Sequence, residues 1–168
     1  MHKFTVIVLA IFSACTVSNP KYAPIKGKYV EPPFEIITSS SKEAVWDKLI
    51  DLFAQNGLSI KIIDKSSGLI ISEETRMPWS MEDKNGKLYK SDAFIVLPRR
   101  TVDGKVYNYS MVTGEWNVRI KSGEGNKTII NVNIVNVRVR IDALNPTIVA
   151  SEAKSTGLFE KSISDQIK

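Results

Sequence analysis

The chain of 168 residues contains one cysteine, Cys15, and one histidine, His2, and this scarcity excludes several kinds of chemistry. A single thiol cannot form an intramolecular disulfide, so packing must hold the fold together. Structural zinc sites built from cysteine and histidine need four such ligands and are excluded. Residues 3–168 also lack the imidazole base that Cys-His and Ser-His-Asp nucleophile systems use. The sequence therefore assigns no catalytic, cofactor-binding or metal-binding residue.

The sequence also has no strongly apolar run long enough to cross a bilayer. The main apolar run, residues 4–12, is about half of the ~20 residues that a transmembrane helix needs. It follows Lys3 and precedes Ser13-Ala14-Cys15, which is the order of charged, apolar and small residues in a secretory signal. We therefore expect residues 1–14 to be a signal peptide, and the remaining 154 suffice for one domain with a core.

Phe12-Ser13-Ala14-Cys15 resembles a bacterial lipobox, in which the cysteine becomes the acylated first residue of the mature protein. The resemblance implies a lipid anchor on Cys15; the alternative is a buried thiol at the end of an ordinary signal. No Asp follows Cys15, and by resemblance to enterobacterial sorting this favours the outer membrane, with the domain facing the periplasm. Residues 15–33 contain four prolines and no periodicity, so we predict a flexible tether.

The charge balance is mildly basic. The formal net charge is +5, and it falls to +4 without Lys3. Such a balance favours anionic lipid headgroups or nucleic acid through long-range attraction. Secretion argues against nucleic acid, so the expected partners are a membrane, reached through the lipid, and an envelope protein.

A strand and an amphipathic helix open the predicted domain, which covers residues 34–168. Residues 34–38 are short, β-branched and apolar, as in a strand. Ser40 and Glu43 have the spacing of a capping box, which predicts a helix start, and Gly57 can adopt the left-handed conformation that ends a helix. One broad apolar face of this helix is formed by Val45, Trp46, Leu49, Ile50 and Phe53.

Strands are predicted at residues 59–64, 69–74 and 93–97, and the clearest pair is 114–121 with 127–141. Placing Lys121 opposite Lys127 sets Trp116 opposite Val132. The apolar side chains of the two strands then lie on one face of the pair.

The longer strand changes phase. Ile130, Val132 and Ile134 have even numbers, whereas the later apolar residues have odd numbers: Val135, Val137, Val139 and Ile141. A β-bulge near Ile134 and Val135 would explain the change, and a section buried on both faces is the alternative.

A second helix is predicted at residues 155–167, with Thr156 as a cap and an apolar stripe of Phe159, Ile163 and Ile167. The order of elements predicts a single α+β domain. In this domain a curved antiparallel sheet packs against an N-terminal and a C-terminal helix.

Two segments carry a resemblance to a known family. They are Val45-Trp46-Asp47-Lys48-Leu49, followed by Asn56-Gly57, and residues 62–70, Ile-Ile-Asp-Lys-Ser-Ser-Gly-Leu-Ile. They resemble BamC-like (NlpB-like) outer-membrane lipoproteins, accessory components of the β-barrel assembly machinery, and the similarity is best over residues 36–75. The resemblance implies a helix-grip fold, in which a sheet wraps around a long C-terminal helix that would begin near residues 155–161.

Two groups of side chains are candidates for contact with a partner. The first group consists of aromatic residues in irregular segments: Trp79, Tyr89, Tyr107 and Tyr109. Such residues are common in protein contacts, and packing within the loops is the alternative. Arg138 and Arg140 share one strand face, which either binds an anion or is simply solvated.

Three functions follow from these patterns. The first is a non-enzymatic, lipid-anchored envelope protein that binds other proteins as an accessory or scaffold. The second is a carrier of an apolar small molecule or lipid in a helix-grip cavity. The third is a hydrolase using Glu73, Glu74 and Asp92. It ranks last, because adjacent residues of a strand face opposite sides and Glu73 and Glu74 cannot pair there.

Overall fold

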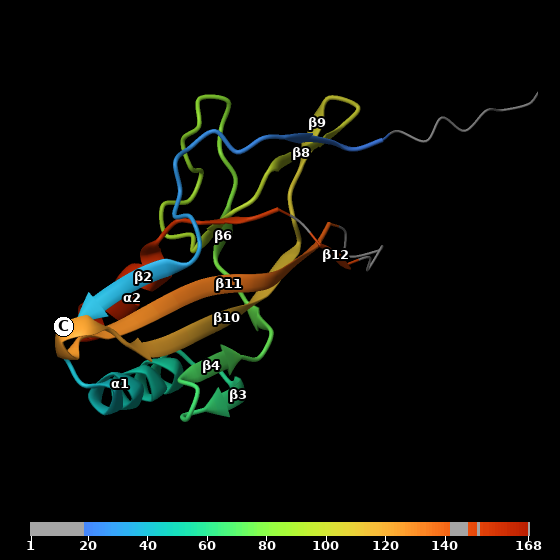
Figure 1. The fold of residues 1–168 in the computed structure, drawn as a ribbon. Helices are drawn as coiled ribbons and strands as arrows, with labels where there is room; N and C mark the ends of the chain where they lie inside the picture. Colours follow the sequence, from blue (N-terminus) through green and yellow to red (C-terminus); the bar gives the residue numbers. More distant parts are fainter. Residues whose placement is uncertain (1–18, 142–147, 151, 168) are drawn as a thin grey trace, which may run out of the picture.

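The computed structural model describes residues 19–141, 148–150 and 152–167. These residues form a mixed α+β fold of mainly antiparallel strands with two α-helices (Figure 1). The predicted signal peptide and Cys15 lie outside the described residues.

The main sheet is built around two long strands, β10 (Met111–Ser122) and β11 (Thr128–Arg140), which cross the centre of Figure 1 side by side. On the β11 side, β2 and β12 pair with different parts of that strand. On the β10 side, β4 and β5 pair with β10, and β3 pairs with β4. The bounds of these strands are β2 (Phe34–Thr38), β3 (Ile60–Asp64), β4 (Leu69–Ser72), β5 (Thr75–Arg76) and β12 (Ile148–Ala150).

Two smaller sheets complete the fold. One contains β1 (Lys21–Ala23), β8 (Arg99–Val102) and β9 (Lys105–Tyr107), in the order β1-β8-β9. The other contains β6 (Trp79–Ser80) and β7 (Ile95–Val96) in a parallel pair, with β13 (Lys154–Ser155) antiparallel to β7. The strand predicted at residues 93–97 is therefore real but only two residues long.

Both helices cover one face of the main sheet. The helix α1 (Lys42–Gln55) buries Val45, Trp46, Leu49, Leu52 and Phe53, while α2 (Leu158–Ile167) buries the predicted stripe of Phe159, Ile163 and Ile167. The rings of Phe159 and Trp116 stack with centroids 3.8 Å apart, which fixes α2 against β10. Each fully buried side chain of this size contributes ~1.5–3 kcal/mol to folding.

The start of α1 corrects a detail of the prediction. The N-cap is Ser41 rather than Ser40, and its hydroxyl accepts a hydrogen bond from the Ala44 N–H at 3.2 Å. Ser40 instead extends the connection from β2, where its carbonyl accepts from the Thr128 hydroxyl at 2.7 Å. The capping box with Glu43 is therefore wrong by one residue, while Gly57 ends the helix at φ +64° as expected.

The register of β10 with β11 differs from the predicted one by two residues. Ser122 lies opposite Thr128, so Trp116 lies opposite Ile134 instead of Val132. The five-residue loop has the predicted length, but its turn is centred on Gly125 and Asn126, both with positive φ. A shift of two leaves each side chain on its expected face, which is why Trp116 and Val118 are buried as predicted.

The predicted bulge is present, about two residues beyond the expected place. On β10, one residue separates Thr113 from Glu115. On β11, two residues, Asn136 and Val137, separate the partners of these two, Arg138 and Val135. Asn136 adopts φ +53°, the left-handed conformation found at the first position of many bulges. The extra residue reverses the facing of the strand, so Val139 is buried like Ile130 and Val132 despite its different parity.

The segment predicted to be a flexible tether is docked on the domain over much of its length. The N-terminal strap, which we define as residues 21–30, starts as β1 paired with β8 and ends where the Val30 N–H donates to the Ser155 carbonyl at 3.1 Å. It runs as the blue segment beside β8 and β9 in Figure 1. The prediction of a tether up to residue 33 is corrected accordingly, because proline-rich composition did not reveal these partners.

Candidate functional site

A pocket of about 500 Å³ lies between the β6–β7 sheet and the β8–β9 hairpin. We call it the aromatic pocket. Its lining is formed by Trp79, Ser80, Met81, Tyr89, Lys90, Val106, Asn108 and Tyr109. Three of the four aromatic residues singled out from the sequence therefore line one cavity.

The floor of the aromatic pocket is rigid. The ring of Tyr109 meets the ring of Trp79 edge-on, with centroids 5.4 Å apart and planes at 82°. Tyr109 is only 3% exposed, and its hydroxyl donates to the Pro98 carbonyl at 2.7 Å. Trp79 is itself held in β6, opposite Ile95 of β7. Both rings are thus fixed before any ligand arrives.

The rim of the pocket is apolar but open to solvent. Tyr89 is 63% exposed and Val106 is 52% exposed, which is high for large side chains of this kind. The Tyr89 N–H donates to the Met81 carbonyl at 3.1 Å, so the backbone beneath the exposed ring is tied down. A partner that covered these two side chains would bury apolar surface at little cost in backbone order.

One cation lies at the pocket. The Lys90 ammonium is 5.5 Å from the centroid of the Trp79 ring, within the range of a cation–π contact. The Lys90 N–H donates to the Ser80 hydroxyl at 2.9 Å, which holds the backbone of Lys90 beside β6. The pocket therefore combines aromatic walls with a single positive charge.

Tyr107 does not belong to this pocket. It alternates with Val106 along β9, so the two side chains face opposite sides of the hairpin. On its own side, Tyr107 lies opposite Arg100, whose guanidinium is 5.5 Å from the Tyr107 ring centroid, and Arg100 lies opposite Tyr22 of β1. Tyr107 is 43% exposed on this second surface.

Arg138 and Arg140 share a face of β11, as predicted, but neither lines the aromatic pocket. Arg138 forms an ion pair with Glu74, with 3.7 Å between Nη1 and Oε2. The backbone carbonyl of Arg140 accepts from the Ser110 N–H at 2.7 Å. Their predicted contact role is separate from that of the three aromatic residues.

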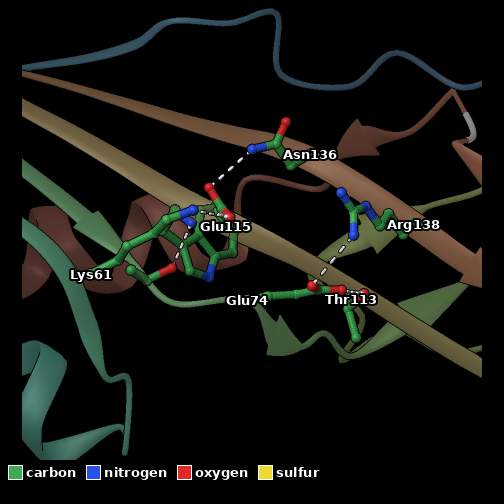
Figure 2. Close-up of polar contacts among 8 residues, drawn as sticks. Lys61, Glu74, Thr113, Glu115, Asn136 and Arg138 are labelled. Carbon is green, nitrogen blue, oxygen red and sulfur yellow. Dashed lines mark hydrogen bonds and ion pairs between the residues drawn. The ribbon is translucent and has the colours of Figure 1, made fainter.

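The three acids considered for a hydrolase, Glu73, Glu74 and Asp92, are all exposed. Figure 2 shows that Glu74 accepts a hydrogen bond from the Thr113 hydroxyl besides pairing with Arg138. The Glu73 N–H donates to the Ser59 carbonyl at 2.7 Å, and both Glu73 and Asp92 are exposed. Within the described residues no group of three or more His, Cys, Asp or Glu side chains is arranged to hold a metal ion.

A second polar group in Figure 2 holds the bulge. The Glu115 carboxylate accepts from the Lys61 ammonium at 3.1 Å and from the Asn136 amide at 2.9 Å. These two hydrogen bonds lower the pKa of Glu115 and outweigh the opposing effect of burial. The group joins β3, β10 and β11 and thereby fixes the point where β11 bends.

Glu82 is a buried acid that sequence reasoning missed. Its two carboxylate oxygens accept from the Lys26 N–H at 2.7 Å, the Gly27 N–H at 2.8 Å and the Tyr29 hydroxyl at 2.7 Å. Glu82 follows Met81 of the aromatic pocket, so it fastens the N-terminal strap directly behind the pocket wall. The remaining lining residues were also missed, although Lys90 and Asn108 adjoin Tyr89 and Tyr109 in sequence.

No protein-family model matches this chain, and no curated protein is significantly similar to it. In residues 19–141, 148–150 and 152–167, neither helix has the length and apolar character needed to span a membrane.

Proposed function

We propose that this protein is a lipid-anchored, non-enzymatic envelope protein that binds an extended apolar segment of another envelope protein in the aromatic pocket. The observation that carries the proposal is the cavity of about 500 Å³ with a fixed Trp79–Tyr109 floor and an exposed Tyr89–Val106 rim. Aromatic side chains in partly open pockets are typical of protein contact sites. The lipid on Cys15 comes from the resemblance to a lipobox.

An extended segment fits because of the strand beside the pocket. Within the described residues, β9 pairs only with β8, so its outer edge carries backbone groups open to another strand. Val106 of β9 also lines the pocket. A segment added along β9 would gain main-chain hydrogen bonds while alternate side chains entered the pocket, as in β-strand addition.

The finer fold assignment also belongs to this proposal. The packing of α2 against β10 through Phe159 and Trp116 supports a helix-grip arrangement of sheet and C-terminal helix. The resemblance over residues 36–75 and the lipobox at Cys15 support a location at the outer membrane, facing the periplasm, and the resemblance supports a role in outer-membrane protein assembly.

Site-specific cross-linking in intact cells tests the proposal. A photoreactive phenylalanine at position 89 should capture a defined envelope protein, because that side chain is at the rim of the aromatic pocket. The same residue at position 107 is a matched control, since it lies on the face of the β8–β9 hairpin turned away from the aromatic pocket. Adding Val106→Asp, an exposed substitution, should lower the yield at position 89 at least tenfold.

Equal capture at positions 89 and 107, or a yield unaffected by Val106→Asp, would contradict the proposal. The alternative function, a carrier of an apolar small molecule, is favoured by the pocket volume, which is within the range of small-molecule sites. A stoichiometric adduct in the native mass spectrum, lost in Val106→Asp, would establish the carrier instead.

A further inference from the structure

A second pocket, of about 220 Å³, lies where β2, β11 and β13 meet the first turn of α2. We call it the carboxylate pocket. Apolar walls are formed by residues such as Val30, Phe34, Val132, Ile134 and Ala153. It shares no lining residue with the aromatic pocket and has no part in the function proposed above.

An acid lines this pocket without a hydrogen-bond donor. Glu160 is only 2% exposed, and its Oε2 atom has no donor within hydrogen-bond distance among the residues that the structure describes. Burying a carboxylate without a compensating donor is costly, and natural folds rarely leave such a group unsatisfied. The position of Glu160 therefore calls for a ligand that donates to it.

Glu160 is the polar group that the pocket offers to a ligand on its core side. Val132 and Ile134 of β11 line the pocket with apolar side chains, and Asn133 alternates with them, so its side chain faces the other side of the sheet. A single buried acceptor among apolar walls favours a ligand with one polar, N–H-bearing head and an apolar tail.

The charges around the pocket leave Glu160 uncompensated. The Lys154 ammonium, which also lines the pocket, is 3.5 Å from a carboxylate oxygen of Glu31 and pairs with it at the surface. Both of these side chains are substantially exposed, whereas Glu160 is enclosed. The local excess is thus one negative charge, which selects a cation.

We propose that the carboxylate pocket binds a small organic ammonium ion. The ammonium head donates to Glu160 Oε2, and a short alkyl chain packs against Phe34 and Ile134. The volume equals that of about seven waters at ~30 Å³ each, which accommodates such a chain. A bare metal ion would leave the apolar walls unused.

Ligand-observed NMR of the full chain in detergent, with n-butylammonium as the probe, tests the proposal. Wild type should bind n-butylammonium saturably, while n-butanol, of equal length but neutral, should not bind. Glu160→Gln should weaken binding at least tenfold, because it removes the charge at the same volume. Glu35→Gln, an exposed acid next to Phe34 on β2, is the matched control and should leave the affinity unchanged.

Ala153→Leu is a second variant that keeps the carboxylate but fills the pocket, and it should also abolish binding. Circular dichroism of each variant checks that the fold is retained. No saturable binding to wild type, equal affinity in folded Glu160→Gln, or displacement of the probe by Ca²⁺ would overturn the proposal. Tyr89→Ala should leave n-butylammonium binding unchanged, which separates this site from the aromatic pocket.

Discussion

Glu82 fastens the N-terminal strap through three hydrogen bonds. Burial by itself would raise the pKa of this carboxyl, but the hydrogen bonds from the Lys26 N–H, the Tyr29 hydroxyl and the Gly27 N–H bring it below the usual 4.5. Burial and the nearby Glu82 charge raise the pKa of Tyr29 above 10.0. Near neutral pH the Glu82 carboxylate therefore stays ionised and accepts the hydrogen bond, while the Tyr29 hydroxyl keeps its proton and donates it.

Replacing Glu82 by Gln should lower the free energy of unfolding by about 2 kcal/mol at pH 7, because charge-assisted hydrogen bonds become weaker and one acceptor is lost. Urea denaturation measures this change. The freed strap should also become a trypsin substrate after Lys26 and Lys28. Asp92→Asn, at an exposed acid, is the control and should alter neither property.

The difference between wild type and Glu82→Gln should depend on pH in a defined direction. A carboxyl whose folded pKa lies below its unfolded value of 4.5 stabilises the protein above that pH and loses the effect as pH falls further. The raised pKa of Tyr29 acts in the opposite sense, so its contribution is complete below pH 10.0 and declines at higher pH. A difference that persisted unchanged into strong acid would show that the carboxylate charge is not responsible.

At the scale of residues, the sequence predicted part of the candidate site. Trp79, Tyr89 and Tyr109 could be selected because aromatic residues between regular elements are conspicuous. Tyr107 lies on a different surface from these three, and the sequence could not separate it, because β9 is only three residues long and its alternation shows only once its pairing with β8 is known. Glu82 gave no signal, since its partners, two backbone N–H groups and the Tyr29 hydroxyl, are more than fifty residues away.

Among the elements, the bulge in β11 determines how the long hairpin covers the core. It allows Ile130 and Val139, of different parity, to be buried on the same side. Asn136 makes this possible by adopting φ +53°, a conformation that Asn tolerates better than most residues. Its side chain adds a hydrogen bond to Glu115.

Asn136→Val should destabilise the protein by ~2 kcal/mol or more, because a β-branched residue is strained at positive φ and cannot donate to Glu115. Asn131→Val is the matched control on the same strand. Its backbone is regular and its Oδ1 is buried without a donor in the described region, so that change should be neutral or stabilising. Chemical denaturation of both variants decides the matter; equal losses would mean that the bulge conformation contributes nothing.

Long amphipathic elements were predictable and short ones were not. The helices and the β10–β11 pair carry enough periodic residues to be identified, and even the phase change in β11 appears in the sequence. The register was missed because it depends on which residues of the loop adopt positive φ, here Gly125 and Asn126. The strands β5 to β9 have two to four residues each, so tertiary contacts rather than local pattern define them.

On the scale of the whole molecule, the strap limits how far the domain can lie from a membrane. The strap begins at Lys21, so only residues 16–20 separate it from Cys15. Five residues span at most ~18 Å when fully extended. If Cys15 carries a lipid, the β1-β8-β9 sheet and the aromatic pocket beside it stay close to the membrane surface.

Cys15→Ser should therefore move the protein from the membrane fraction to the soluble fraction, or leave it with an uncut leader, without changing the fold of residues 21–167. The physical reason is that a thioether-linked lipid requires the Cys15 sulfur, which serine lacks. Fractionation of cells and the intact mass of the N-terminal peptide measure the outcome. Ser18→Ala, three residues further along, is the control and should remain membrane-bound. A wild-type protein with an unmodified Cys15 thiol, released into the soluble fraction, would refute the anchor and with it the membrane-proximal placement of the pocket.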